Sequence, residues 1–371
     1  MLEQPSVWLA IIAFVAAIGP LVFFHELGHY GVARLFGVKA EAFSIGFGRE
    51  IAGWTDKRGT RWKVGWLPLG GYVRFAGDMD AASRPAHGDG DPDHFQNRPV
   101  WQRFLIVLAG PVSNFLLAIL IFAALFMTLG TLQSSNVVGE VVPDSAAARM
   151  DLRPGDEILS IEGQGTEQFS DVARIVSLRP DENVELVIKR DERQITLKGQ
   201  LGAIEEEDRF GQKVRLGLLG VASAEARFDR AGPVTALGLA TNQTVGLTRS
   251  IVDGLGQIIT GKRSIRELGG PLKIAQISGQ AWVLGLYSFI FLVALLSINL
   301  GFINLLPIPM LDGGHLALYT IEAARRRPLS EAAQERAFRG GLAFLLIFVL
   351  FVTLNDTVSI GLFDRLQRLI G

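Results

Sequence analysis

The chain has 371 residues, 49% of them hydrophobic, and a mean hydropathy of +0.31, which exceeds the apolar share of an ordinary soluble domain. Its formal net charge is -1, so no basic field favours nucleic acid, and we expect no nucleic-acid partner. Cysteine is absent, which excludes disulfides, cysteine nucleophiles and thiolate metal sites, so any metal must be held by His, Asp or Glu.

Four apolar stretches can each supply the roughly 20 residues that a helix needs to cross a hydrocarbon core of about 30 Å. They cover residues 4–24, 104–139, 274–311 and 340–363, the last interrupted by Asp356. Ala16 and Ala17 would suit a signal-peptide cleavage site, but Glu3 precedes the first stretch where a signal carries Lys or Arg. We therefore expect four transmembrane helices in a lipid bilayer, the first of them retained.

The first stretch leads into His25-Glu26-Leu27-Gly28-His29, an H-E-x-x-H pattern. On a helix, positions i and i+4 share one face, so both imidazoles can bind one zinc ion. Glu26 can then take a proton from the attacking water as general base. The alternative is chance, but ionisable groups are costly beside an apolar helix and mark function there.

Residues 37–100 are expected to form a β-hairpin region followed by an acidic linker. Strand patterns over residues 43–54, 61–67 and 72–75 surround a polar turn at 56–60. The aromatic side chains, Tyr72 among them, suit a hairpin in the membrane interface, although a small soluble sheet on the cytoplasmic side is an equally plain reading. Residues 77–99 look like a mobile linker.

Residues 131–225 have the composition of a soluble domain. A short helix after Ser145, a turn at Pro154-Gly155-Asp156 and a strand over 157–161 resemble a PDZ domain, with further strands expected over 183–189 and 194–198. Such a domain would bind an extended peptide in its groove; a small mixed domain without a ligand is the alternative. In the following segment, 226–280, apolar residues at helical spacing indicate a membrane-associated amphipathic helix.

A third metal ligand is needed, and residues 304–315 offer ionisable groups at the end of another span. Asp312 is the preferred ligand, because Pro307 and Pro309 break the helix and let the backbone turn there. Two His and one carboxylate leave one zinc position open for water, as catalysis requires. His315 is the rival ligand, with a supporting role or a place in the helix start as the plainer reading.

Charge sets the expected orientation. The loops between the first two and the last two spans are rich in Arg and Lys, and the second of them carries Arg325, Arg326, Arg327, Arg336 and Arg339. Both loops should be cytoplasmic. The long middle segment and both termini would face the periplasm of a Gram-negative cell, with the active site towards the cytoplasmic side of the inner membrane.

These motifs together resemble the site-2 protease family of intramembrane zinc metalloproteases. H-E-x-x-H on a first helix is paired with Asn304-x-x-Pro-x-Pro-x-Leu-Asp-Gly on a later one. The run Trp101–Asn114, Gly46-Phe47-Gly48 and Gly270-Pro271 match the bacterial RseP type, so the resemblance covers nearly the whole chain. It implies zinc as cofactor with His25, His29 and Asp312 as ligands, Glu26 as catalytic base, and Asn304 and Asn114 near the substrate path.

The expected fold is a polytopic α-helical membrane protein with four transmembrane helices, a membrane-associated β-hairpin region and one inserted PDZ-like α+β domain. A strand-like surface near Asn304, Pro307 and Pro309, or the hairpin at Tyr72, could hold a substrate extended. The expected segments are 1–36 with H-E-x-x-H, 37–100, 101–130, 131–225, 226–280, 281–325 with the Asp312 motif, and 326–371.

The resemblance also implies the substrates: single-span membrane proteins such as a pre-trimmed anti-sigma factor, or remnant signal peptides. The RseP type has two tandem PDZ domains and this chain has room for one, which puts size-filter rules in doubt. One rival reading is a catalytically silent PDZ-containing factor that binds membrane proteins, against which the intact Glu26 argues. Another is a metal transporter, but one polar cluster does not make an ion path.

Overall fold

The computed structural model describes residues 5–77, 91, 93–207, 213–224, 226–261, 269–327 and 329–359. The chain divides into two compact units. Unit 1 combines Met1–Leu125 with Val234–Gly371, and unit 2 is Phe126–Pro233. Most of the acidic linker expected over 77–99 lies outside the described residues.

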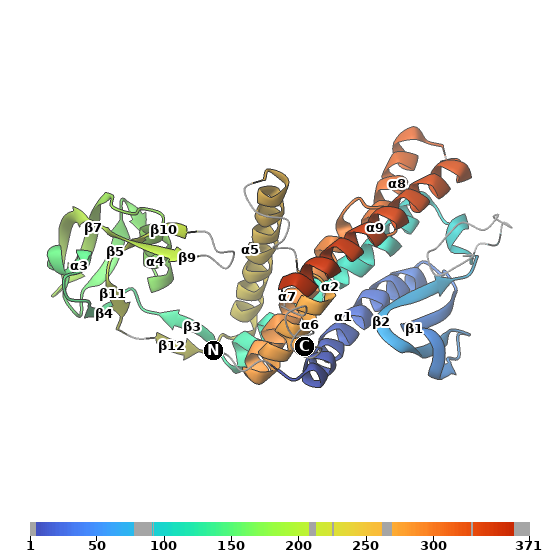
Figure 1. The fold of residues 1–371 in the computed structure, drawn as a ribbon, viewed down its shortest axis with the longest axis horizontal. Coiled ribbons are helices and arrows are strands. Elements are labelled where there is room, and N and C mark those ends of the chain that lie inside the picture. Colours follow the sequence, from blue (N-terminus) through green and yellow to red (C-terminus); the bar gives the residue numbers. More distant parts are fainter. Residues whose placement is uncertain are drawn as a thin grey trace, which may run out of the picture. The chain divides into compact units, whose positions relative to one another are not determined.

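Within the described part of unit 1, four helices are long and apolar enough to cross a membrane. They are α1 (Val7–Leu35), α2 (Val100–Thr128), α7 (Leu286–Leu305) and most of α9 (Glu331–Ser359), all drawn in Figure 1. At 1.5 Å per residue even the shortest, α7, reaches about 30 Å. Helix α1 continues ten residues past His25, so the H-E-x-x-H pattern lies inside the helix and not at its end.

The third apolar stretch differs from the single span expected over 274–311. It forms α6 (Pro271–Val283) and α7, separated at Gly285, whose φ of 107° favours glycine. Helix α6 has 13 residues, about 20 Å, and is too short to cross a bilayer alone. Hydropathy did not reveal this break, because the residues next to Gly285 are apolar on both sides, Val283 and Leu284 before it and Leu286 and Tyr287 after it.

Asp356, the one carboxylate within the fourth apolar stretch, caps helix α6. It is fully buried, and its two oxygens accept hydrogen bonds from the backbone N–H groups of Gly270 at 2.9 Å and Lys273 at 3.0 Å. A helix N-terminus leaves N–H groups without partners and favours a negative charge. A buried charge in this helix is therefore explained by its contact with α6.

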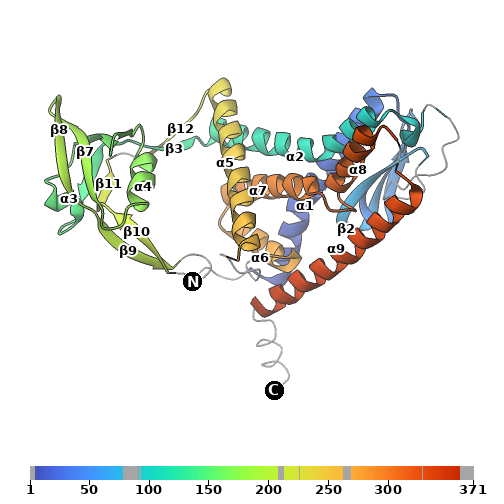
Figure 2. The ribbon, with the colours of Figure 1, turned by 90° about the horizontal axis from the view of Figure 1, so that it is seen from above.

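The two long strands of unit 1 pair into an antiparallel hairpin. β1 (Ala40–Thr55) and β2 (Arg61–Phe75) turn at Asp56, which accepts hydrogen bonds from the N–H groups of Arg58 and Thr60. The hairpin lies beside α1 in both views (Figures 1 and 2). One apolar core joins it to α1, α2 and α8 (Asp312–Arg325), with Phe43, Val73, Ile106 and Leu316 at its centre.

Unit 2 is a small α+β body with its own core. A four-stranded sheet of order β6-β5-β7-β8 is accompanied by the pairs β4–β11, β9–β10 and β3–β12. Alternate residues Val184, Leu186 and Ile188 of β7 are buried, as expected of a strand with one covered face. The strand predicted over 157–161 is β5, with the same bounds.

The elements of unit 2 are, in chain order, β3 (Thr131–Ser134), β4 (Val138–Val141), α3 (Ala146–Arg149), β5 (Glu157–Ile161), β6 (Gln164–Gly165), α4 (Phe169–Ser177), β7 (Asn183–Arg190), β8 (Arg193–Gln200), β9 (Gly202–Glu207), β10 (Lys213–Leu218), β11 (Val221–Ser223) and β12 (Ala226–Asp229). The chain returns to unit 1 through α5 (Pro233–Ile259), where the amphipathic helix was expected. Leu247, Ile251, Leu255 and Ile258 of α5 are half-buried, in keeping with one apolar face.

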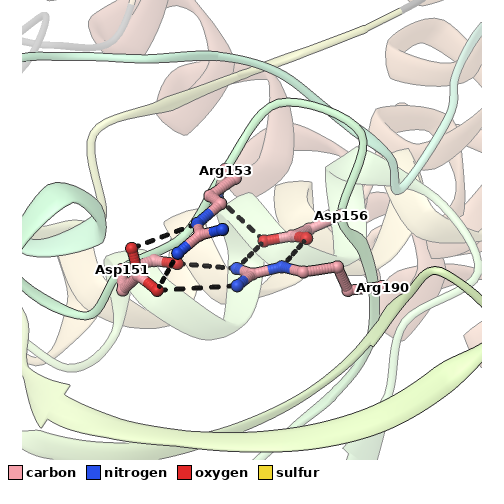
Figure 3. A network of polar contacts seen from close by, with 4 residues as sticks. All are labelled: Asp151, Arg153, Asp156 and Arg190. Atoms are coloured by element: carbon pink, nitrogen blue, oxygen red, sulfur yellow. Dashed lines mark hydrogen bonds and ion pairs between the residues drawn. The ribbon is translucent and has the colours of Figure 1, made fainter.

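A polar network fixes the turn that precedes β5 (Figure 3). Arg190 donates two hydrogen bonds of 2.7 Å to the carboxylate of Asp156, which also accepts the N–H of Arg153 at 2.8 Å. Asp156 is 1% exposed. Burial acts to raise the pKa of the Asp156 carboxyl, but the hydrogen bonds from Arg190 and Arg153 and the nearby positive charge outweigh it, so the pKa is lowered.

Replacing Asp156 with Asn should destabilise unit 2 by about 3 kcal/mol, because Arg190 would lose a buried charged partner. Since the pKa of Asp156 is lowered by folding, its contribution is present above the unfolded value near 4 and is lost as the pH falls through the folded value. Hydrogen exchange of unit 2 in the full chain measures both effects. The exposed Asp151, replaced with Asn, is the control and should change little.

Candidate metal centre

Helix α1 brings two imidazoles together. His25 and His29 are one turn apart, both buried, and their Nε2 atoms lie 3.3 Å from each other. Their rings meet edge to face with centroids 4.8 Å apart. Gly28, between them, faces α2, where a side chain in its place would collide with the backbone oxygen of Ala109. Close packing of α1 on α2 therefore requires glycine at this position.

Asp312, the first residue of α8, completes the cluster. Its Oδ2 lies 3.1 Å from Nε2 of His25 and 3.4 Å from Nε2 of His29. The ligand atoms of the three residues all lie within 4.8 Å of one another. They are the one group of three or more His, Asp or Glu side chains with metal-binding geometry in the part of the chain that the structure describes.

Backbone geometry delivers Asp312 to this position. After α7 ends at Leu305, the chain turns sharply and Met310 takes a φ of 85° before α8 begins. Side chains at Gly313 or Gly314 would collide with the backbone of Leu305 and Ile308. Further along α8, Glu322 pairs with Arg103 of α2 at 2.8 Å, and this contact anchors the helix that carries Asp312.

The donor set fits zinc. Nδ1 of His29 lies 2.9 Å from the backbone oxygen of Ile106, and a carbonyl can only accept, so Nδ1 carries the proton and Nε2 keeps a lone pair for a metal. Oδ2 of Asp312 is buried without a hydrogen-bond partner. An orphaned carboxylate oxygen beside two imidazoles is the environment expected around a cation. Two nitrogens and one oxygen leave a fourth zinc position open.

Glu26 lies beside the same cluster in a cavity of about 290 Å³. Its carboxyl group lies near the backbone of Val73 in β2. The cavity is lined by α1, β2, α7 and α8, through residues that include His25, Glu26, His29, Tyr72, Asn304, Asp312 and His315. A carboxylate next to a potential metal site and open to a cavity can exchange protons with a bound reactant.

The other predicted site residues divide into two groups. Asn304 lines the cavity with its Nδ2 3.5 Å from Nε2 of His25, and Asn114 contacts the same ring from behind. Pro307 and Pro309 are not among the lining residues; Pro309 packs against Gly341 of α9. His315 lines the cavity but is outside the group of metal-binding geometry, with its ring 4.9 Å from that of Phe338.

Sequence reasoning did not identify two backbone features of the site. One is the carbonyl of Ile106, for which the sequence carries no signal. The other is the pair Gly70-Gly71 of β2, which lines the cavity so closely that a side chain on Gly71 would touch Glu26 and Val22. Adjacent glycines inside a strand are a recognised sign of close approach by another group.

Comparison with known proteins places the site in context. The sequence model of peptidase family M50 matches residues 13–348. The Agrobacterium fabrum protein Atu1380, named as a zinc metalloprotease, is 41% identical, with 94% of this chain and 96% of that protein covered. The metalloprotease MmpA of Caulobacter vibrioides is 38% identical, with 94% and 95% covered.

Solved structures similar to part of the chain include PDZ domains. The PDZ domain of an SdrC-like protein from Listeria monocytogenes is 20% identical, and the match covers 25% of this chain and 90% of that domain, with a TM-score of 0.19. The PDZ-like interpretation of unit 2 depends on its own strands and helices.

Proposed function

Since this chain belongs to peptidase family M50 and is a zinc-dependent metalloprotease of the membrane, we propose that it cleaves substrates inside the bilayer with zinc held by His25, His29 and Asp312. One observation carries the proposal: three ligand atoms from α1 and α8 converge beside Glu26 in a cavity built partly from membrane helices. Burying ionisable groups in such surroundings costs free energy, so their presence there indicates a function.

Each residue of the site has a separate role in the proposed hydrolysis of the peptide bond. A bound zinc ion would polarise the scissile carbonyl and acidify the attacking water. Glu26 would take the proton of that water and pass it to the leaving amide nitrogen. Asn304, at the cavity wall, has an amide group that can hydrogen-bond the substrate backbone.

A transmembrane helix hides its peptide bonds in its own hydrogen bonds, so it must be extended before cleavage. Backbone at Gly70–Val73 borders the cavity beside Glu26. We propose that β2 pairs with the extended substrate there, with Tyr72 beside it. The turn that carries Pro307 and Pro309 would support this arrangement from outside the cavity.

The proposed substrates are single-span membrane proteins, such as an anti-sigma factor already trimmed by another protease, or remnant signal peptides. The proposal follows from the resemblance to site-2 proteases. The segment 131–225 would be a PDZ-like domain, consistent with its helix–turn–strand order around Asp156, and would bind a substrate peptide in its groove. The Arg-rich loops favour an inner-membrane orientation with this domain and both termini in the periplasm.

Co-expression with single-span membrane proteins tests the proposal. Each candidate is supplied intact and truncated shortly outside its membrane segment, and products are identified by mass. We expect cleavage within the membrane segment of a truncated candidate with the wild-type enzyme and no product with Glu26→Gln. Cleavage confined to soluble regions would contradict the intramembrane assignment. Equal product from both enzymes would contradict the assigned base.

A further inference from the structure

A buried amide contacts the back of His25. Asn114 of α2 is fully buried, and its side-chain nitrogen lies 3.1 Å from Nδ1 of His25, on the side of the ring away from Asp312. The side-chain oxygen of Asn114 is also buried and has no hydrogen-bond partner. A buried amide that uses only one of its two polar ends calls for an explanation.

The proton on His25 links this contact to the metal site. For Nε2 of His25 to offer a lone pair to zinc, Nδ1 must carry the proton, and Nδ1 then needs an acceptor. The amide nitrogen of Asn114 cannot accept, but its orphaned oxygen can, and a half-turn of the amide brings that oxygen to the ring. Amide nitrogen and oxygen have nearly the same shape, so this turn requires little repacking.

Helix α2 already provides a hydrogen-bond acceptor for Nδ1 of the other imidazole, His29. The carbonyl of Ile106 holds the proton of His29 on Nδ1, and Ile106 lies two helical turns before Asn114 on the same face of α2. Gly110, midway between them, leaves room for the ring of His29. The α2 face that carries Ile106, Gly110 and Asn114 thus meets both imidazoles.

Two hydroxyl groups hold Asn114 in register. Ser297 of α7 donates to the backbone oxygen of Asn114 at 2.7 Å, and Ser113 of α2 donates to the backbone oxygen of Phe24 at 2.7 Å. These contacts tie α2 to α7 and to α1 next to the amide. The backbone that carries the Asn114 amide is therefore fixed next to His25.

We propose that Asn114 is a positioning residue that selects the zinc-binding tautomer of His25. When zinc is present, the amide oxygen accepts a hydrogen bond from the Nδ1–H of His25; without zinc, the amide nitrogen donates to Nδ1, and the proton of the ring is on Nε2, 3.1 Å from Oδ2 of Asp312. This inference rests on the proposed zinc site. Acceptors behind a histidine ligand commonly change metal affinity by 10- to 100-fold.

The test measures zinc affinity of the full-length protein in detergent by competition with a chromogenic chelator. Asn114→Leu keeps the approximate volume but offers no acceptor, and it should weaken zinc binding about 10- to 100-fold. Asn114→Asp always presents an acceptor, and it should bind zinc at least as tightly as the wild type. Asn299→Leu is the matched control, because the amide of Asn299 in α7 bonds only its own helix, at Leu295.

Cobalt substitution provides a second measurement. The visible d–d bands of the Co²⁺ protein report ligand geometry, and they should change in Asn114→Leu but persist in Asn114→Asp and Asn299→Leu. If Asn114→Leu does not fold, Asn114→Asp alone decides, because weaker zinc binding by that variant would overturn the inference. Equal affinity of wild type and Asn114→Leu would also overturn it. Absence of zinc binding by the wild type would instead refute the proposed function.

Discussion

Replacing Glu26 with Gln should lower the rate of membrane-substrate cleavage by about 10²- to 10⁴-fold while the enzyme keeps its zinc. The amide of Gln matches the carboxylate in size, but it cannot take a proton from water. Single-turnover cleavage in proteoliposomes measures the rate. Elemental analysis of the same preparation measures the metal.

Glu41→Gln serves as the control for this prediction. Glu41 is an exposed carboxylate that pairs with Arg74 on the β1–β2 hairpin, so its neutralisation should leave both rate and zinc content near the wild-type values. Cleavage by Glu26→Gln at the wild-type rate would assign the base to another residue. Loss of zinc from Glu26→Gln would mean that Glu26 supports the ligands as well as the chemistry.

The catalytic cluster could be predicted because its key relation is local. His25 and His29 lie one turn apart on any helix, and the long apolar stretch that leads into them predicts a helix. Asp312 came from a different argument: a third ligand was needed, and residues 304–315 offer ionisable groups where two prolines break another span. Its distance of 3.1 Å from His25 depends on the path of α7 and α8, which no local pattern specifies.

The remaining features of the site depend on packing between distant segments. Asn114 meets His25 across 89 positions of sequence, and Asp356 caps α6 across 86. Periodicity reports which face of a helix is apolar but not which neighbour covers it. The break at Gly285 was hidden for a related reason, because the residues next to it are apolar on both sides.

In the β1–β2 hairpin, too, the local features were predicted from the sequence and the contacts with distant segments were not. Its turn at Asp56 was predicted from the polar residues 56–60, and the strand patterns on both sides were recognised. That β2 would continue through Gly70 and Gly71 and border the cavity beside Glu26 was not predicted. Two adjacent glycines can mark either a turn or a close approach in sequence, and in the structure they permit close approach of the strand to α1.

Replacing Asp312 with Ala should weaken zinc binding by more than the roughly 100-fold expected from loss of a hydrogen-bond partner behind a ligand, because a ligand itself is removed. Cleavage should be lost with the metal. Zinc removal from the wild type by a chelator should likewise abolish cleavage, and stoichiometric zinc should restore it. Added zinc at the same concentration should not restore Asp312→Ala.

His315→Gln is the matched variant for this experiment, because His315 is the alternative candidate for the third zinc ligand. It lies one helical turn along α8 and lines the same cavity, yet it is outside the group whose donor atoms lie within 4.8 Å. We therefore expect His315→Gln to keep stoichiometric zinc. If that variant loses zinc while Asp312→Ala retains it, His315 is the third ligand, and the orphaned oxygen of Asp312 needs another explanation.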